Sequence, residues 1–246
     1  MNIAVIARPC FDYSAFADVL SQTGASWRRT PNAKDSEELV EVAGRICYFS
    51  FGDTQSEKDN AHFIRDLLKM GHTSVLEHVS WTFLITGISR ALSHQLVRHR
   101  IGISFSQLSQ QFHDETDAEF VEPAQLHHNP GSEEIWRQAV ESSKEAYVKL
   151  KRTLESSGRF TDDRTLRSIA RSVLPNATET KLIATANARE LRHLIALRGS
   201  KSCEHEMRCF IALLLRKLQD ESSALFSDLS IAELEDGSPY VVQARP

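Results

Sequence analysis

The sequence predicts a single α/β (α+β) domain that spans residues 1–246. Three observations predict this class. The length of 246 residues suits one large domain, and a content of 41% hydrophobic and 25% charged residues is that of an ordinary globular chain. Short runs of β-branched and aromatic residues, which predict strands, are separated by longer amphipathic patterns, which predict helices.

The charge, the apolar pattern and the cysteines exclude several classes of protein. A formal net charge of −4 weighs against a general nucleic-acid-binding protein, because such proteins carry a basic surplus. No apolar run approaches the roughly 20 residues needed to span a bilayer, and the N-terminus lacks a signal-peptide pattern. Cys10, Cys47, Cys203 and Cys209 lack metal-binding or disulfide spacing, so we expect buried, reduced thiols. We therefore expect a cytoplasmic protein that binds neither nucleic acid nor a membrane.

The N-terminal part of the chain predicts a strand followed by three helices. Residues 3–7 form a short apolar run, and residues 13–20 are amphipathic. Residues 35–48 predict a helix that Ser36 caps, and residues 57–70 predict another. These elements are expected to be scaffold, because they carry no chemical signal of their own.

The next elements lead to the most polar part of the chain. Residues 79–85 alternate as a half-buried strand does, Gly87 is expected to end that strand, and Ile88 is expected to begin a helix. Residues three and four apart share a helix face, so this helix should place Gln95 beside Arg98. Both side chains would then point at the loop that follows.

The rest of the chain predicts four helices and three short strands. We expect strands at residues 119–121, 181–185 and 240–243, and helices from 132 to 157, from Thr161 to just before Pro175, over 187–198 and over 204–226. Asn187 is expected to cap its helix, with Glu190 three residues later as in a capping box. The last strand is expected to close the sheet.

The stretch from residue 98 to residue 112 carries the strongest chemical signal. Arg98, His99 and Arg100 are adjacent, and no acid follows before Asp114. Adjacent cations repel one another unless anions lie between them, and guanidinium groups bind phosphate through paired donors. The stretch therefore indicates an anion site, although cations at a helix end also suit the helix dipole.

Residues 71–78 form a second polar group, which contains His72, Glu77 and His78. A metal site is one interpretation, but neither a His-x-x-x-His spacing nor a fourth ligand supports it. The alternative is a polar turn whose side chains bond backbone groups. We assign no metal to the chain.

The central stretch also resembles a known signature. Arg98-His99-Arg100 is followed after eight residues by Ser109, with Gln111 two positions later. This resembles the flavin-dependent thymidylate synthases (the ThyX family), whose signature runs Arg-His-Arg, seven residues, Ser, any residue, Arg. The extra residue and the glutamine in place of the last arginine are departures from that pattern.

Three further segments are similar to motifs of the same family. They are Gly-His-Thr-Ser-Val-Leu-Glu-His at residues 71–78, Ala-Arg-Ser-Val-Leu-Pro at 170–175, and Asn-Ala-Arg at 187–189. The motifs occur in the family's order, so their combined specificity is high. Ser202 stands where many members have a histidine, so the role of that histidine is not carried over.

The resemblance implies roles for individual residues. The implied flavin contacts are His72, Ser74, Arg98, His99, Arg100, Gln107, Asn187, Arg189 and His193. The implied nucleotide contacts are Gln95, Arg98, Gln107, Leu108, Ser109, Gln110, Gln111, Arg171 and Arg198. Two of these are implied to be catalytic: Arg198 would stabilise negative charge on the pyrimidine carbonyls, and Ser109 would orient the nucleotide.

The resemblance also implies a fold and an activity. The fold is a small, mostly antiparallel sheet flanked by helices, in a homotetramer whose active sites lie between subunits. The activity is reductive methylation of C5 of a uridylate, dUMP or UMP, with FAD as cofactor, NADPH as reductant and methylenetetrahydrofolate as carbon donor. Gln111 and the loop insertion favour a pocket that admits a ribose 2′-hydroxyl, as in the family branch that methylates UMP for polyoxin-type antibiotics.

Two other functions stay open at this point. A degenerate family member would hold flavin and oxidise NADPH without methylating a nucleotide, which Gln111 and Ser202 would explain. A nucleic-acid-binding protein would use Arg98, Arg100 and the basic residues between 164 and 171, but the negative net charge and the lack of interleaved aromatic residues oppose it.

Overall fold

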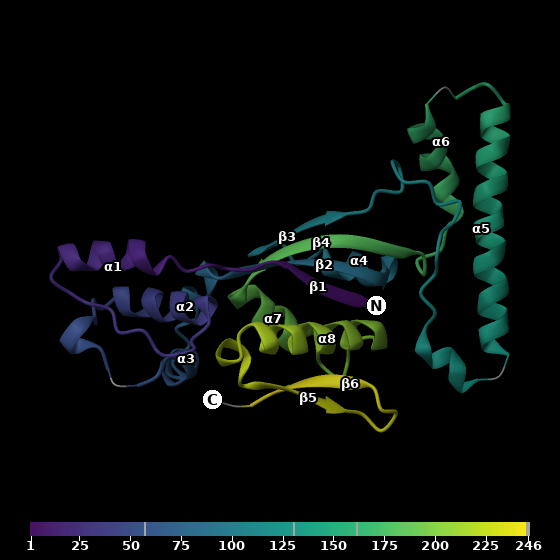
Figure 1. The fold of residues 1–246 in the computed structure, drawn as a ribbon. Coiled ribbons are helices and arrows are strands. Elements are labelled where there is room, and N and C mark those ends of the chain that lie inside the picture. Colours follow the sequence, from purple (N-terminus) through teal and green to yellow (C-terminus); the bar gives the residue numbers. More distant parts are fainter. Residues whose placement is uncertain (57, 130, 161, 245–246) are drawn as a thin grey trace. The chain divides into compact units, whose positions relative to one another are not determined.

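The computed structural model describes residues 1–56, 58–129, 131–160 and 162–244. It has the mixed α/β architecture that the sequence predicts (Figure 1). The described chain divides into two compact units. The first unit holds residues 1–2, 84–99 and 105–183, and the second unit holds residues 3–83, 100–104 and 184–246. A single domain over residues 1–246 stays a prediction.

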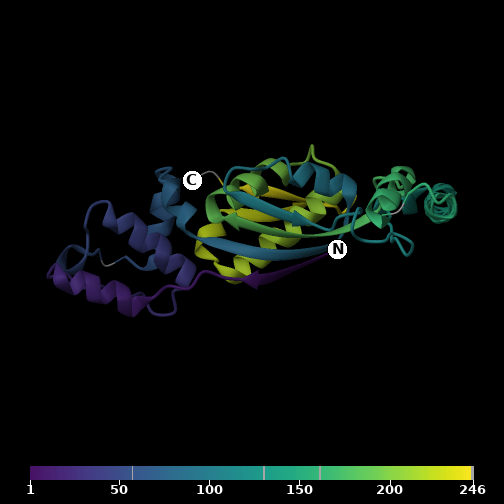
Figure 2. The ribbon, with the colours of Figure 1, turned by 90° about the horizontal axis from the view of Figure 1, so that it is seen from above.

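A four-stranded sheet has the strand order β1-β2-β4-β3 (Figure 2). Its strands are β1 (Asn2–Ala7), β2 (Ser80–Ser89), β4 (Glu179–Asn187) and β3 (Ile103–Gln107). The Ala188 N–H donates to the Val79 carbonyl, and the hydroxyls of Thr82 and Thr185 are 3.0 Å apart. Partner numbers rise along one strand as they fall along the other, so β2 and β4 are antiparallel.

Gly87 lies within β2 and does not end it, so the prediction of a helix from Ile88 is wrong. Gly87 has a φ of 68°, and its N–H donates to Glu179 Oε1 at 2.7 Å. An added Cβ would lie 2.7 Å from the Met1 nitrogen. Glycine therefore permits a close backbone approach within the strand. The helix begins after Ser89, whose side chain accepts a backbone N–H of the first turn.

The second unit contains most of the helices and a hairpin. Its helices are α1 (Tyr13–Gln22), α2 (Asp35–Ile46), α3 (Asn60–Lys69), α7 (Ala188–Arg198) and α8 (His205–Glu221), with the 3₁₀ turns η1 (Gly52–Thr54), η2 (Thr73–His78) and η5 (Ala224–Phe226). Its hairpin pairs β5 (Leu229–Glu233) with β6 (Pro239–Gln243) in antiparallel register. The expectation that the last strand closes the main sheet is therefore wrong, because β6 pairs with a strand that the sequence pattern did not reveal.

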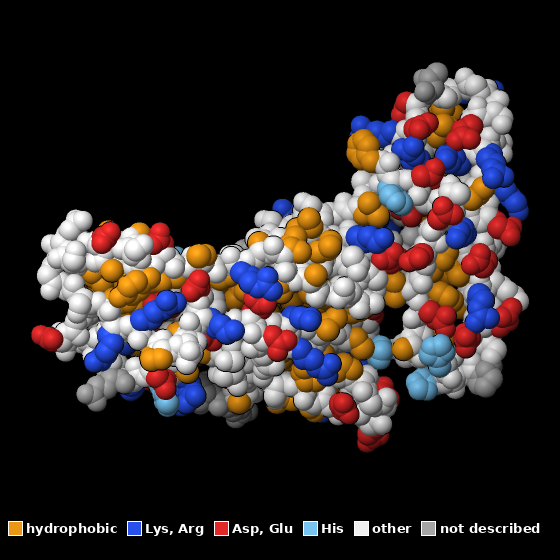
Figure 3. All heavy atoms as spheres, viewed as in Figure 1, with side chains coloured by type: hydrophobic (Ala, Val, Ile, Leu, Met, Phe, Trp, Pro, Cys, Tyr) orange, Lys and Arg blue, Asp and Glu red, His pale blue; other side chains and the backbone are white. Residues whose placement is uncertain are grey.

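The first unit contains three α-helices and two 3₁₀ turns. They are α4 (Arg90–Leu96), η3 (Ala124–His128), α5 (Ser132–Ser156), α6 (Asp163–Ala170) and η4 (Arg171–Val173). The strand expected at residues 119–121 is a single antiparallel bridge between Phe120 and Thr178. The exposed face of α5 carries acidic and basic side chains next to one another (Figure 3), as an amphipathic surface helix does.

Several helix starts differ from the expected ones. Glu57 and Thr161, the expected first residues of two helices, lie outside the described residues. α3 begins after Asp59, whose carboxylate accepts the His62 N–H. α2 is preceded by Lys34, so the expectation that Ser36 caps it is wrong; Ser36 is a buried residue of its first turn.

A buried ion pair lies in the second unit between α2 and α3. Arg45 Nη2 is 2.7 Å from Glu41 Oε1, and both side chains are almost fully buried. The guanidinium of Arg45 is 4.3 Å from the ring centre of Phe63, and Asn60 donates a further hydrogen bond to Glu41 at 2.8 Å. A buried pair of this kind is held by its hydrogen bonds and by the aromatic face.

The sequence also led to expectations about the burial of the cysteines and about segments that could cross a membrane. Cys10 and Cys47 are exposed and Cys203 and Cys209 are partly exposed, so the expectation of buried thiols is wrong. All four thiols are free. Among the described residues, no helix combines the length and the apolar character that crossing a bilayer requires.

Replacing Arg45 with methionine should destabilise the chain by roughly 3–5 kcal/mol, because it leaves the Glu41 carboxylate buried without its cation. Urea denaturation monitored by circular dichroism measures the change. Arg152→Met is the matched control, since Arg152 is exposed on α5 and should change stability by about 0.5 kcal/mol or less. Equal effects of the two substitutions would contradict a special role for the buried pair.

Candidate functional site

Helix α4 ends before the arginine-histidine-arginine triplet. Its last residue is Leu96, and Val97 is the C-cap with a φ of −68° and a ψ of −4°. The prediction that Gln95 and Arg98 share a helix face is therefore wrong, because the chain turns here before β3 begins. Arg98 is exposed in that turn, and the His99 N–H donates to the Leu96 carbonyl at 3.0 Å.

The polar run that follows is anchored to the sheet of the first unit. Gln107 Nε2 donates to Ser93 Oγ at 3.0 Å and to Thr180 Oγ1 at 3.1 Å. The Leu108 N–H donates to the Lys181 carbonyl at 2.9 Å. These bonds fix the end of β3, so the residues after it start from a defined position.

Ser109 and Gln110 begin a tight turn. Ser109 Oγ accepts the Gln111 N–H at 3.3 Å, and the Ser109 carbonyl accepts the His113 N–H at 2.8 Å. Within the described part of the chain, no imidazole or carboxylate bonds to the Ser109 hydroxyl, so a base that would make it a nucleophile is absent there. Gln110 is only 6% exposed, and its side chain interacts with the Glu115 carboxyl, which partly offsets the effect of burial on the pKa of Glu115.

Two arginines and one carboxylate lie together in the first unit. Burial lowers the pKa of Arg90, and the neighbouring charge of Arg171 lowers it further, while Glu115 opposes this change. Glu115 is 4% exposed, and burial raises its pKa. Among the described residues no hydrogen bond reaches the Arg171 guanidinium. The group therefore has an excess of positive charge in a partly desolvated place, which suits an anion.

Arg90 was not singled out from the sequence, although a signal was present. Arg90 is the first residue of α4, and a cation at a helix N-terminus opposes the helix dipole. A residue that is unfavourable for its own helix indicates another role. Its proximity to Arg171, which lies far along the sequence, is visible only in the fold.

The turn is tied to α5 through Asp114. The Tyr147 hydroxyl donates to Asp114 Oδ1 at 3.1 Å and accepts the Glu115 N–H at 3.1 Å. Lys151 and Thr116 also donate to the Asp114 carboxylate. Burial raises the pKa of Asp114, but these hydrogen bonds outweigh burial and hold its pKa far below the ordinary value.

The second unit contains a cavity of about 430 Å³ at the start of α7. Its lining residues are Glu77, Ile101, Gly102, Asn187, Arg189, Glu190 and His193. Three of them, Asn187, Arg189 and His193, are predicted flavin contacts. A neighbouring cavity of about 280 Å³ shares Arg189 and His193. Both cavities are close to the size of small-molecule and cofactor sites.

Local interactions hold the polar groups of the larger cavity. Asn187 caps α7, as the sequence predicts, by accepting the Glu190 N–H at 2.9 Å. An added Cβ on Gly102 would lie 2.6 Å from Asn187 Nδ2, so only glycine allows this approach. Arg189 forms an ion pair with Glu77. The cavity thus offers a carboxamide, a guanidinium and an imidazole on rigid backbone.

Some predicted site residues belong neither to the cavity at the start of α7 nor to the group of Arg90, Arg171 and Glu115. His72 and Ser74 are exposed at η2, but neither is among the described residues that line the cavities. Arg100 is exposed, and Arg198 is partly exposed at the C-terminal end of α7. Their implied roles stay predictions, as do those of Gln95 and Arg98.

One group of histidine and acidic side chains lies close together at the surface of the first unit. In the described ranges, the group close enough to share an ion is Glu122, His127 and Glu133, and it does not include His72, Glu77 or His78. His127 Nδ1 is 3.4 Å from Glu133 and 3.7 Å from Glu122. Exposed acidic groups of this kind are common without a metal ion, so this geometry assigns no metal.

Replacing Lys151 with methionine should destabilise the chain at pH 7 by roughly 1 kcal/mol, after allowance for solvent screening. The stability that ionised Asp114 contributes is present above its unfolded pKa of about 4 and is lost as the pH falls through the lowered folded pKa. The difference from the parent protein should therefore shrink below about pH 4. Denaturation midpoints measured from pH 7 to pH 2 check this, with Lys149→Met as the exposed control; a gap independent of pH would contradict it.

Known proteins are similar to this chain over the region that contains these motifs. The sequence profile described as "Thymidylate synthase complementing protein" matches residues 30–222. The flavin-dependent thymidylate synthase of Mycobacteroides abscessus is 40% identical over 234 residues, which cover 93% of this chain and 92% of the relative. The corresponding enzyme of Mycolicibacterium gilvum is 40% identical over 244 residues, which cover 97% and 93%. The chain therefore belongs to the flavin-dependent thymidylate synthase (ThyX) family.

Proposed function

We propose that this chain catalyses the flavin-dependent reductive methylation of a uridylate at C5, with methylenetetrahydrofolate as carbon donor and NADPH as reductant. The observation that carries the proposal is the cavity of about 430 Å³ in which Asn187, Arg189 and His193 meet. The sequence motif implies a flavin contact for each of these three residues. Relatives named flavin-dependent thymidylate synthase support the same activity.

The residues of the second unit fit FAD. The Arg189 guanidinium offers donors to a phosphate oxygen, and the His193 imidazole and Asn187 carboxamide offer polar contacts to a heterocycle. Gly102 lets the Asn187 side chain pack directly against its backbone. FAD, when bound, supplies the redox chemistry that converts the transferred carbon into a methyl group. We propose that His72, Ser74, Arg98, His99, Arg100 and Gln107 complete its contacts.

The residues of the first unit fit a nucleoside monophosphate. Arg90 and Arg171 provide an excess of positive charge for a phosphate, and the turn at Ser109 provides hydroxyl and amide groups beside it. We propose that Gln95, Arg98, Gln107, Leu108, Gln110 and Gln111 also face the nucleotide. Ser109 orients it.

Arg198 is the proposed electrostatic catalyst. The form of the pyrimidine in which C5 is nucleophilic carries negative charge on its carbonyls, and a permanently charged guanidinium stabilises that charge. None of the free thiols belongs to the two groups of site residues. The proposal therefore assigns the polarisation of the ring to cations and no covalent step to a cysteine.

We further propose the assembly, the location and the acceptor. The chain forms a homotetramer with active sites between subunits, each subunit being a single domain over residues 1–246. Free thiols support a cytoplasmic location. Gln111 and the extra residue before Ser109 support use of UMP besides dUMP, as in the branch of the family that serves antibiotic biosynthesis.

Product analysis tests this function. The purified protein, reconstituted with FAD, is supplied with NADPH, methylenetetrahydrofolate and either dUMP or UMP, and the nucleotides are separated by chromatography. We expect the C5-methylated nucleotide from UMP at a rate at least comparable to that from dUMP. A strong preference for dUMP would remove the UMP proposal alone. NADPH oxidation with no methylated product would contradict the methylating function.

A further inference from the structure

Position 111 holds a neutral side chain, and the structure places a cation against it. Gln111 Oε1 accepts a hydrogen bond from Arg164 Nε at 3.3 Å. Gln111 Nε2 donates to Ser168 Oγ at 3.4 Å. Both polar atoms of the Gln111 carboxamide therefore form hydrogen bonds with side chains of α6. Gln111 acts on its surroundings through one of these side chains, Arg164.

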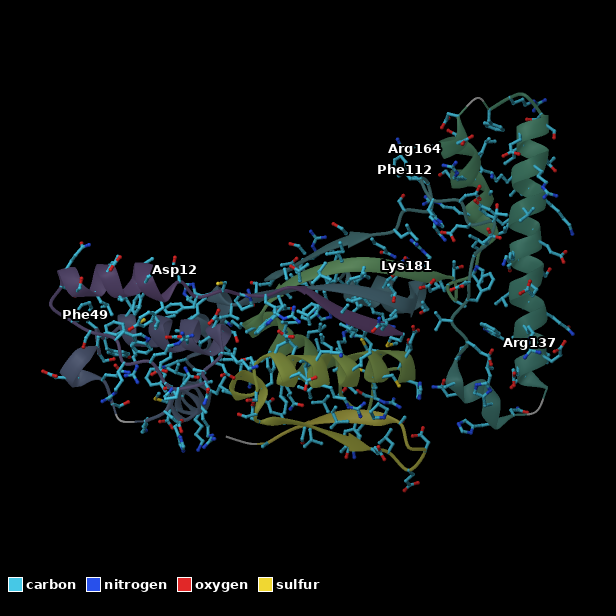
Figure 4. All side chains as sticks on the ribbon, viewed as in Figure 1. Asp12, Phe49, Phe112, Arg137, Arg164 and Lys181 are labelled. Atoms are coloured by element: carbon cyan, nitrogen blue, oxygen red, sulfur yellow. The ribbon has the colours of Figure 1, made fainter. Side chains whose placement is uncertain are left out.

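Arg164 is held in place on a second side. Its guanidinium centre lies 5.2 Å from the ring centre of Phe112, and Figure 4 shows the two labelled side chains next to each other. Stacking on an aromatic face and a hydrogen bond at Nε together restrict the rotamers of a long side chain. Arg164 is therefore oriented before any ligand arrives, which lowers the entropy cost of binding.

A nearby acid, Asp162, interacts electrostatically with Arg164, but its carboxylate accepts the Thr165 N–H as the cap of α6. Within the described part of the chain, Nη1 and Nη2 of Arg164 make no hydrogen bond, and no carboxylate forms an ion pair with it. Arg167, one helical turn further on, differs: it is paired with Asp163 at 2.8 Å and bonds the Phe112 carbonyl at 3.1 Å. Two outward donors of Arg164 are thus available to an anion.

Arg164 also extends the cationic group of the first unit. Arg164 lies in the first turn of α6, and Arg171 is the C-cap residue at the other end of that helix. The positive charge of Arg171 acts on Arg90. Gln111 lies in the turn that Ser109 begins. The first unit therefore supplies all of these cations and the turn.

We infer that Arg164 supplies the positive charge that position 111 lacks and binds the phosphate group of the nucleotide, with Gln111 as its positioning residue. This inference rests on the proposed function and names the group that anchors its substrate. A phosphate monoester presents several acceptor oxygens, and the two outward donors of one guanidinium match a pair of them.

Equilibrium titration of the FAD-reconstituted protein tests the inference. The probes are UMP and dUMP, with uridine and deoxyuridine as ligands that lack the phosphate. Arg164→Gln should weaken the binding of both nucleotides by roughly ten- to a hundredfold, the effect of losing a hydrogen bond to a charged group. The binding of both nucleosides should not change. Arg137→Gln, an exposed arginine of α5 in the same unit (Figure 4), is the matched control and should leave all four affinities unchanged.

Two further variants distinguish the role of Arg164 in nucleotide binding from that of Gln111. Adding Gln111→Arg to Arg164→Gln should regain most of the lost nucleotide affinity, because it returns a guanidinium to the same side of the turn. Gln111→Ala alone should weaken nucleotide binding, but it should have no additional effect when Arg164 is already glutamine. That non-additivity is expected only if the glutamine acts through the arginine.

Three results would overturn the inference. They are nucleotide binding by Arg164→Gln as tight as that of the parent protein, an equal loss of nucleoside and nucleotide binding, and an increase in the KM for NADPH alone. The last result would assign Arg164 to the reductant. A parent protein that binds neither nucleotide would overturn the proposed function itself, and this outcome is distinct from failure of one variant.

Discussion

Electrostatic repulsion between closely placed cations is the constraint on which the candidate site depends. Arg171 lies close enough to Arg90 to disfavour the charged form of Arg90, and one buried carboxylate, Glu115, offsets only part of that cost. The rest of the first unit holds this arrangement rigidly. Tyr147 joins the turn to α5 through Asp114 and the Glu115 backbone. A bound anion would relieve the repulsion, so a site that is unfavourable when empty binds its substrate more strongly.

The cavity of the second unit differs from the cationic group of the first unit in how its side chains are held and how its charge is compensated. Its cavity is built on the first turn of a helix, where Asn187 is committed to capping and Gly102 allows a close approach. Arg189 is compensated by Glu77, so this cation does not strain the fold. Rigid backbone and a paired charge suit a cofactor that stays bound, whereas the uncompensated cations of the first unit suit a substrate that must be exchanged.

Local patterns were enough to predict most elements. The cap of α7 follows from Asn187 and Glu190 alone, and the length of α5 follows from its periodicity. Interactions between distant parts of the chain decided the rest. Gly87 continues a strand because of Glu179 and Met1, and β6 pairs with β5 rather than with the main sheet. No local pattern contains those partners.

The site residues divide in the same way, into those that a sequence motif reveals and those that only the fold brings together. Motif resemblance selected Asn187, Arg189 and His193, and these residues do share a cavity. Arg90 and Arg164 were not selected as site residues, because their significance comes from contacts with residues far along the chain. A sequence motif records residue types at fixed spacing, whereas the replacement of one charge by another in space is a property of the fold.

The affinity of the purified protein for FAD tests the central claim most directly, because the proposed methylation needs the flavin that the cavity at the start of α7 is proposed to hold. Titration of the apoprotein with FAD, monitored by flavin fluorescence, should show saturable binding that Arg189→Met weakens by at least roughly tenfold. Arg216→Met, on the exposed face of α8, should bind as the parent does. A protein that takes up no FAD, or an Arg189→Met variant with the parent affinity, would contradict the account.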